Sequence, residues 1–271
     1  MTRETITDRA HGIDVSHHQE EFVSWKTWGQ IDFAIAKVGQ GYNTPYSKGI
    51  LGDPTDFYRL WNDGVSQVDI RGLYLYQIGG YSWITQAEKV LNFAYKLNIK
   101  PHMLWCDLEK IGNTIDATML ADTLRILDHW RDEGIYTVGL YTNKDVLQNY
   151  IQPIGLKHFG QEWLDRLYAY PLWYAQYWWQ PSPNKQPATP YFHSNWNIWQ
   201  YTDRGDSFEM RDGVRMRHYG SPDLNVYNGS VEEMIAWLKI GKVLLPPVLT
   251  RPKVTIKVNW ESYGDVDVKV K

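Results

Sequence analysis

Short hydrophobic runs alternate with longer amphipathic segments along the first half of the chain. The runs are almost continuous in apolar residues, which is typical of β-strands that are covered on both faces. We expect such strands at 11–16, 32–38, 71–77, 102–109 and 137–143. Helices are expected between and after them at 54–63, 82–97, 114–133 and 144–150. This alternation predicts a parallel α/β sheet or barrel.

The pattern changes after residue 165, where strand-like segments follow one another without convincing helices between them. These segments lie at 172–177, 196–201 and 223–227. We therefore expect plain strands to close the barrel. A proline-rich loop at 180–190 is expected to shape a groove. Ser230 is expected to cap a last helix at 231–240.

The length and composition of the chain favour one main domain. A chain of 271 residues with 43% hydrophobic content can bury one large core, as α/β barrels of this size do. We expect the barrel at 1–240, a proline-containing linker at 241–253 and a short C-terminal β-hairpin at 254–271.

Two carboxylates stand at the end of the fourth expected strand, in Asp107-Leu108-Glu109. Side chains alternate across a strand, so Asp107 and Glu109 should share one face while Cys106 and Leu108 pack on the other. Acids held together at the end of a buried strand repel each other and lose hydration, which raises at least one pKa towards the range of a general acid. Taken alone, such a triplet is more often a solvated strand end.

Two further acids lie on expected strands. Asp14 is near the end of the first strand, and Asp223 begins the last one. Because chemistry in α/β barrels collects at the C-terminal ends of the strands, Asp14 is a candidate site residue, although a helix cap or a turn is the commoner role.

Charge and composition narrow the class of function. A net charge of −3 provides no basic field for a polyanion, so we expect no nucleic-acid partner. Fourteen Trp and nineteen Tyr offer flat rings for stacking on sugars, although most of them are expected to pack in the core. The single cysteine excludes an intramolecular disulfide. His17-His18 lack the spacing of metal ligands, so we expect no metal site.

No stretch approaches the length of a membrane span, and residues 1–10 are polar without the apolar core of a signal peptide. We therefore expect a protein that is made in the cytoplasm and needs help to act outside the cell.

Seven motifs carry a resemblance to a known family. They are Gly12-Ile13-Asp14-Val15-Ser16-His17-His18-Gln19, Phe33-Ala34-Ile35-Ala36-Lys37, Asp107-Leu108-Glu109, Gly139-Leu140-Tyr141-Thr142-Asn143, Leu172-Trp173-Tyr174-Ala175, Trp199-Gln200-Tyr201-Thr202 and Asp223-Leu224-Asn225. In this order the chain resembles the glycoside hydrolase family 25 lysozymes, or Chalaropsis-type muramidases, which are common among phage endolysins and bacterial autolysins. One departure is Tyr74-Leu75-Tyr76-Gln77, where many members end the third strand with Tyr-His-Phe. We expect one polar contact near the sugar to differ there.

The resemblance implies an irregular TIM-like barrel of about five β/α units closed by additional strands, with the catalytic site in residues 1–240. It also implies hydrolysis of the β-1,4 bond between N-acetylmuramic acid and N-acetylglucosamine in bacterial peptidoglycan, without a cofactor. Glu109 matches the general acid of the family, and Asp14, Asp107 and Asp223 match the other acids of its site. Further side chains near these strand ends are expected to bind the substrate. They are Tyr76, Gln77, Tyr141, Trp173, Gln200 and Tyr201.

We expect a monomer whose partner is the glycan strand of peptidoglycan. The missing signal peptide favours a phage enzyme that reaches the wall after phage-mediated release. Two other readings stay open to test. One is a non-catalytic peptidoglycan-binding or phage structural module on the same barrel. The other is a chitinase-like enzyme, although the D-x-x-D-x-D-x-E run of such enzymes does not precede Asp107.

The role of Asp107 is open at this point. Residues two apart on a strand have Cα atoms separated by about 6.6 Å, which does not decide between a retaining and an inverting carboxylate pair. Asp107 can act on water, on the sugar carbon, or on the substrate's acetamide in a substrate-assisted reaction.

Overall fold

The computed structural model describes most of the expected barrel and two short strands near the C-terminus. The described residues are 9–16, 31–40, 61–62, 64–96, 98–110, 114–135, 137–178, 182–188, 195–203, 222–239, 254–257 and 267–270. Expectations outside them concern His17, His18, the linker at 241–253, and the helix at 54–63 except for Trp61 and Asn62.

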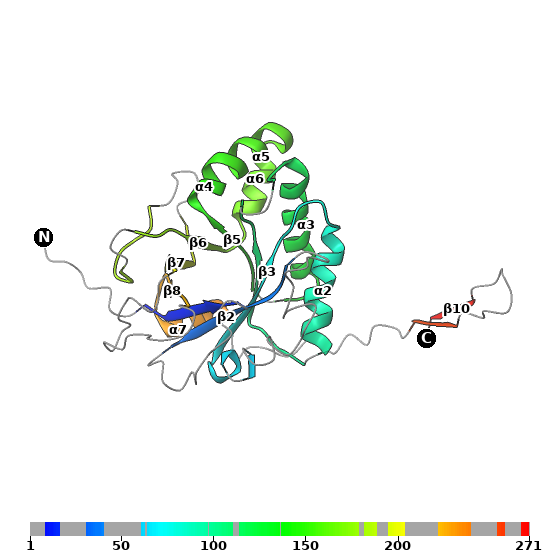
Figure 1. The fold of residues 1–271 in the computed structure, drawn as a ribbon, viewed down its shortest axis with the longest axis horizontal. Helices are drawn as coiled ribbons and strands as arrows, with labels where there is room; N and C mark the ends of the chain where they lie inside the picture. Colours follow the sequence, from blue (N-terminus) through cyan, green and yellow to red (C-terminus); the bar gives the residue numbers. More distant parts are fainter. Residues whose placement is uncertain are drawn as a thin grey trace, which may run out of the picture. The chain divides into compact units, whose positions relative to one another are not determined.

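Eight strands form a closed barrel in chain order. They are β1 (His11–Val15), β2 (Phe33–Gln40), β3 (Ile70–Tyr76), β4 (Met103–Asp107), β5 (Thr137–Asn143), β6 (Leu172–Ala175), β7 (Ile198–Thr202) and β8 (Asp223–Tyr227). Neighbouring strands from β1 to β7 pair in parallel, whereas β8 is antiparallel to both β7 and β1. Figure 1 shows the strands as a ring. The predicted α/β barrel, closed by plain strands, is confirmed.

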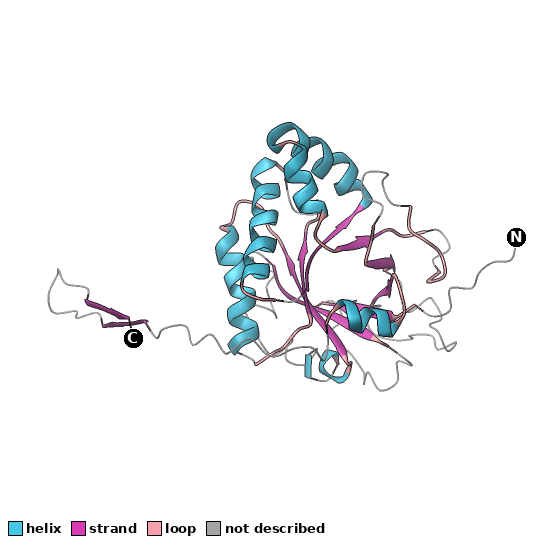
Figure 2. Ribbon diagram, turned by 180° about the vertical axis from the view of Figure 1, so that it is seen from behind, coloured by secondary structure: helices cyan, strands magenta, loops and turns pink. Residues whose placement is uncertain are grey.

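Helices lie on the outer side of β3, β4 and β5 (Figures 1 and 2). The helical elements are the 3-10 turn η3 (Val65–Gln67), α2 (Trp83–Lys96), α3 (Ala117–Asp132), α4 (Lys144–Val146), the π-helical turn η4 (Leu147–Ile151), α5 (Gln152–Phe159), α6 (Gln161–Tyr168) and α7 (Val231–Trp237). Side chains fix their starts. Asp116 accepts a hydrogen bond from the Met119 amide at α3, and Ser230 forms a capping box with Glu233 at α7, as its position predicted.

Helical structure after β5 extends further than the sequence indicated. The prediction ended at residue 150, whereas α5 and α6 continue to Tyr168. Pro153 and Gly160 punctuate this stretch like helix breakers. In the structure Pro153 occupies the first turn of α5, where proline is tolerated, and Gly160 ends that helix with a φ of 84°.

The interior of the barrel contains large apolar side chains, among them Phe33, Ile35, Trp105 and Ile198. Glycines on neighbouring strands make room for the largest rings. A Cβ on Gly12 would lie 2.3 Å from the Phe33 ring, and one on Gly139 would lie 2.2 Å from the Trp105 ring. Large and small residues therefore face each other across adjacent strands, which fills the interior without overlap.

Helix α7 closes one end of this interior. Its Met234, together with Leu238 just beyond the helix, is buried in the same cluster as Phe33 and Met103 near the starts of β2 and β4. Figure 2, drawn from behind, shows α7 in front of the ring of strands. The opposite end, where β1 to β7 finish, faces the viewer in Figure 1.

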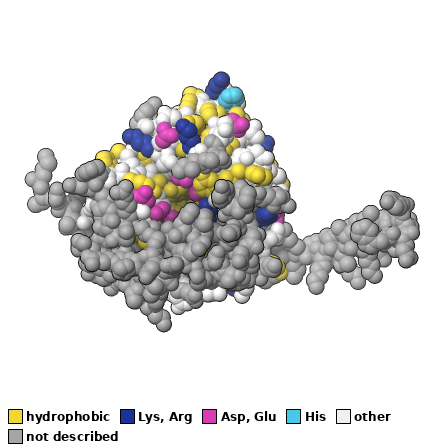
Figure 3. Space-filling view, in the orientation of Figure 1, with side chains coloured by type: hydrophobic (Ala, Val, Ile, Leu, Met, Phe, Trp, Pro, Cys, Tyr) yellow, Lys and Arg dark blue, Asp and Glu magenta, His cyan; other side chains and the backbone are white. Residues whose placement is uncertain are grey.

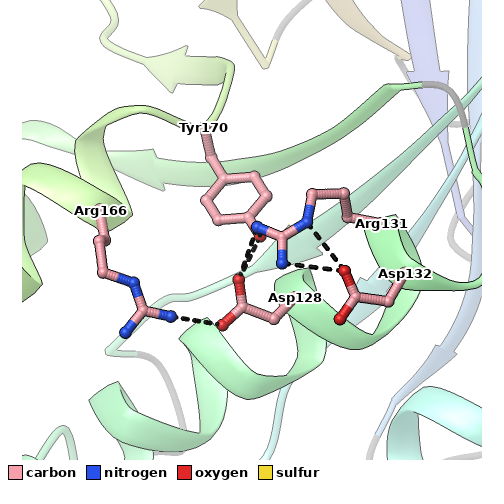
Figure 4. A network of polar contacts seen from close by, with 5 residues as sticks. All are labelled: Asp128, Arg131, Asp132, Arg166 and Tyr170. Carbon is pink, nitrogen blue, oxygen red and sulfur yellow. Dashed lines mark hydrogen bonds and ion pairs between the residues drawn. The ribbon is translucent and has the colours of Figure 1, made fainter.

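A polar network fastens α6 to α3 on the outside of the barrel (Figure 4). Asp128 accepts from Arg166 at 3.0 Å and from the Tyr170 hydroxyl at 2.6 Å. Arg131 donates to the Tyr170 hydroxyl at 2.9 Å. Because both arginines are largely exposed, these contacts fix geometry more than they add stability.

The C-terminal residues Gly241–Lys271 form a separate unit, which follows the main unit, Met1–Ile240, in the sequence. In it, β9 (Val254–Lys257) and β10 (Asp267–Val270) pair in antiparallel register. Along the described chain, every helix is too short or too polar to cross a membrane.

Candidate active site

Three of the four predicted acids lie on strands at one end of the barrel. Asp14 is the fourth residue of β1, Asp107 ends β4, and Asp223 begins β8. Because β8 runs against its neighbours, its first residue lies where β1 finishes, and Asp14 and Asp223 are register partners. Figure 3, drawn from the same side as Figure 1, shows acidic side chains among hydrophobic ones near the middle of this face.

The fourth acid, Glu109, follows Asp107 by two residues. Cys106 and Leu108 are fully buried in the layer between the strands and the helices, which confirms the predicted alternation. Asp107 is buried on the inner side, and its Oδ1 has no hydrogen-bond partner among the described residues.

Gln200 of β7 joins two of the acids. Its Nε2 donates to Oδ2 of Asp14 at 2.8 Å and to Oδ2 of Asp223 at 2.9 Å. Its Oε1 accepts from the hydroxyls of Tyr141 at 2.9 Å and Tyr177 at 2.7 Å. These four bonds use the full hydrogen-bonding capacity of a glutamine amide. Gln200 therefore holds the two carboxylates in place.

Asn225, two residues after Asp223, connects this network to Trp173 in the apolar interior. Its Nδ2 donates to Oδ2 of Asp14 at 2.8 Å, and its Oδ1 accepts from the Trp173 indole at 2.8 Å. The Trp173 ring packs against the rings of Trp105 and Tyr141. Trp173 is thus an apolar floor beneath the acids rather than an exposed sugar platform.

Burial dominates the protonation of the acid pair on β1 and β8. It raises the pKa of Asp14 to about 7, against the lowering effect of hydrogen bonds from Asn225 and Gln200. Burial also raises the pKa of Asp223 well above its usual range, and the charge of Asp14 adds to this shift. The two carboxylates therefore do not both ionise easily near neutral pH.

The pair on β4 is perturbed in the same direction. Burial, followed by the negative charge of Glu109, raises the pKa of Asp107 well above its usual range. Burial likewise raises the pKa of Glu109, which the positive charge of Lys37 and hydrogen bonds from Tyr141 and Asn143 partly offset. A carboxyl that keeps its proton towards neutral pH is suited to act as a general acid.

Lys37 is a site residue that sequence reasoning did not single out. Its ammonium donates to Oε1 of Gln40 at 2.8 Å and lies 4.7 Å from the centre of the Tyr76 ring. Burial lowers the pKa of Lys37, whereas the charges of Asp107 and Glu109 raise it. The signal in the sequence was one cation inside an otherwise apolar strand.

The predicted substrate-binding residues divide by the face of the strand they occupy. Tyr76, Tyr141, Trp173 and Gln200 lie on the inner side with the acids. Gln77 and Tyr201 lie on the outer face of their strands, away from the acids. Gln77 bonds the Thr123 hydroxyl and the Met119 carbonyl of α3, and Tyr201 packs against Trp199 in the outer layer.

Asn225 and Tyr177 are the other site residues that were missed. Asn225 was detectable because it lies two residues from Asp223 on the same strand face. Tyr177 ends the expected strand at 172–177 and has the same parity as Trp173, which was the available signal, whereas β6 in the structure ends at Ala175. Within the described parts of the chain, His, Cys, Asp and Glu side chains form no group of three or more that could hold a metal ion.

The sequence matches the profile described as glycosyl hydrolases family 25 over residues 13–210, most of the barrel. The chain belongs to this family. It is therefore a glycoside hydrolase.

The sequence identity between this family 25 hydrolase and individual proteins is low. The uncharacterized protein YegX of Escherichia coli (strain K12) is 27% identical over 237 residues, covering 84% of this chain and 73% of YegX. The family 25 glycosyl hydrolase of Bacillus anthracis has a TM-score of 0.59 at 20% identity, covering 84% of this chain and 93% of that one.

Two other solved structures have the same fold. The catalytic domain of an endolysin from a Listeria monocytogenes bacteriophage has a TM-score of 0.57 at 19% identity, covering 85% of this chain and 97% of that one. The spore cortex lytic enzyme SleM of Clostridium perfringens has a TM-score of 0.58 at 19% identity, covering 83% of this chain and 69% of that one. At this identity the similarities establish the barrel fold.

Proposed function

We propose that this family 25 hydrolase is a lysozyme (N-acetylmuramidase), which cleaves the β-1,4 bond between N-acetylmuramic acid and N-acetylglucosamine in bacterial peptidoglycan. The observation that supports this most is the pairing of Glu109, whose pKa burial raises, with the buried Asp107 at the same strand end. The names of two structural relatives, an endolysin and a spore cortex lytic enzyme, agree with a cell-wall substrate.

Glu109 is the general acid in this proposal. It donates its proton to the glycosidic oxygen as the bond to the anomeric carbon breaks, so that the leaving sugar departs as an alcohol. The Tyr141 hydroxyl lies between Glu109 and Oε1 of Gln200. It has one proton to share between them, which ties the orientation of the acid to the network around Asp14.

Asp107 is assigned to the substrate's acetamide. Burial and the neighbouring Glu109 raise its pKa, which makes it a poor nucleophile towards the sugar carbon. Its Oδ1, buried and without a hydrogen-bond partner among the described residues, supports a role in accepting the acetamide N–H. The acetamide oxygen would then attack the anomeric carbon, and water would open the resulting ring with retention.

Glu109→Gln tests the central assignment, because glutamine keeps the shape and removes the acidic proton. The rate at which the enzyme clears a suspension of purified cell walls should decrease by about 10²–10⁴-fold. Glu162→Gln on the exposed surface of α6 is the matched control and should be unaffected. Near-normal turnover by the Glu109 variant would refute the role of Glu109.

Digestion in isotopically labelled water, followed by mass spectrometry, identifies the bond and the stereochemistry together. Label at the reducing end of N-acetylmuramic acid supports the muramidase. Label on N-acetylglucosamine would contradict it, and inversion would contradict the acetamide route. Absence of any new reducing ends would favour the alternative of a non-catalytic peptidoglycan-binding or phage structural module.

We further propose that the protein acts as a monomer on the bacterial wall after phage-mediated release, which its likeness to an endolysin catalytic domain supports. Host cells that express the chain should lyse only when the membrane is opened by a second protein or a solvent. Lysis without permeabilisation would contradict this route.

A further inference from the structure

Two large aromatic residues lie exposed at the acidic end of the barrel. Tyr177 and Trp178 follow the end of β6 and are 47% and 40% exposed. Most aromatic residues of the barrel strands are buried, Trp173 and Tyr141 among them. Exposed rings beside a carboxylate cluster match the two parts of a sugar, because a ring covers the apolar face of a pyranose while polar groups take its hydroxyls.

The hydroxyl of Tyr177 reaches the centre of the acid network. It donates to Oε1 of Gln200 at 2.7 Å, and Gln200 donates in turn to Asp14 and Asp223. After burial, the charges of Asp223 and Asp14 are the largest causes that raise the pKa of Tyr177. Tyr177 is thus 47% exposed while its hydroxyl bonds the glutamine that holds the buried carboxylates.

The backbone that presents Tyr177 is held at the preceding residue, Gln176. The amide of Gln176 donates to the Gln200 carbonyl at 3.1 Å, and the Trp199 indole donates to the Gln176 carbonyl at 2.9 Å. The side chain of Gln176 accepts from the Ala188 amide at 2.6 Å. A ring on such a segment is already in place before a ligand arrives, so binding costs little further ordering.

Orientation of Gln200 alone does not explain an exposed tyrosine here. Tyr141 donates to the same oxygen at 2.9 Å and is only 7% exposed. A second donor to that oxygen needs only its hydroxyl to face Gln200, so the 2.7 Å bond does not require the rest of Tyr177 to be 47% exposed. The exposed position of Tyr177 therefore points to contact with a ligand.

We propose that Tyr177 forms one wall of a sugar subsite next to Asp14 and Asp223, with its ring against an N-acetylated pyranose and its hydroxyl holding Gln200. This inference rests on the proposed function and identifies the residue that links substrate binding to the carboxylate network. Tyr177 contacts the substrate through its ring and acts as a positioning residue through Gln200.

Two substitutions separate the ring from the hydroxyl. Tyr177→Phe keeps the ring, so KM for soluble peptidoglycan oligomers should stay within about twofold while kcat falls about fivefold, the effect of one lost hydrogen bond. Tyr177→Ala removes both and should also raise KM about tenfold. Tyr95→Ala is the matched control, because Tyr95 on α2 is 81% exposed and has no part in the site. Wild-type KM in Tyr177→Ala would overturn the inference.

Binding measured by calorimetry separates failure of the subsite from failure of the proposed hydrolysis. In the Glu109→Gln background, adding Tyr177→Ala should weaken oligomer binding about tenfold. If the wild-type protein cuts nothing but this loss is seen, the subsite stands and the proposed hydrolysis falls. If the wild-type protein cuts and Tyr177→Ala changes neither KM nor binding, the subsite is wrong.

Discussion

At one end of the barrel interior the inward-facing residues of β2 and β4 are Ile35 and Trp105; two positions further along the same strands they are Lys37 and Asp107. The first layer is hydrocarbon packed against glycines, and α7 covers it. The second layer is a set of acids, amides and one lysine. The apolar layer and the polar layer are therefore only two residues apart along the same strand face.

The difference shows what each layer contributes. In the apolar layer every side chain gains by leaving water, so burial and stability agree. In the acidic layer burial raises the pKa of Asp14, Asp107, Glu109 and Asp223, so ionised carboxylates there are destabilising. The stability gained in the apolar layer offsets the electrostatic cost of burying the acids in the other layer.

The largest expected effect is in the apolar layer. In Gly139→Ala the new methyl group would meet the Trp105 ring at 2.2 Å and the Pro171 carbonyl at 2.7 Å. We expect a loss of about 3 kcal/mol or more in unfolding free energy, measured by urea denaturation. Gly79→Ala is the control, since its nearest neighbour is the Met119 sulfur at 3.4 Å. Equal stability of the two variants would show that the interior is not close-packed.

A change in the acidic layer should instead affect activity. Asp107→Asn keeps the size of the side chain and should reduce wall hydrolysis at least about tenfold, with urea denaturation little changed. Near-normal activity would move this role to Asp14 or Asp223. A large loss of stability would show that the two layers are not separable.

Removing a buried acid should stabilise the protein at high pH. Because the folded-state pKa of Asp14 is about 7, folded protein binds more protons than unfolded protein between roughly pH 4 and 7, and stability falls as pH rises through this window. Asp14→Asn removes this loss. The difference in unfolding free energy between this variant and the wild type should be more favourable to the variant at pH 8 than at pH 4. We expect a change on the order of 1 kcal/mol, because neighbouring acids take up part of the proton exchange. No difference between the two pH values would contradict the raised pKa.

The smallest effect concerns the pH profile. The charge of Lys37 lowers the pKa of Glu109, so Lys37→Met should raise that pKa further. The general acid would then stay protonated to higher pH, and the alkaline limb of kcat/KM should shift upwards by about half a pH unit. Lys37→Arg keeps the charge and serves as the control. A downward shift in Lys37→Met would show that Lys37 does not act through Glu109.

Strand parity explains why only some of the predicted substrate-binding residues face the same side as the acids. Tyr76 and Gln77 are adjacent, as are Gln200 and Tyr201, so only one residue of each pair can face the interior. Tyr76 and Gln200 face the barrel interior, while Gln77 and Tyr201 pack on the outer face of the strands. The sequence shows the alternation but not which face points inwards, which depends on how neighbouring strands align.

By itself the sequence determined the positions of the eight strands and the placement of Asp14, Asp107 and Asp223 at strand ends, because hydrophobic periodicity and residue order are local properties. Only the tertiary structure decided that β8 runs antiparallel, which places Asp223 opposite Asp14. It also decided the four bonds of Gln200, the cation of Lys37 beside the acids and the exposed ring of Tyr177. Desolvation and Coulomb interaction depend on distance in space, and closing the barrel brings together residues that are far apart along the chain.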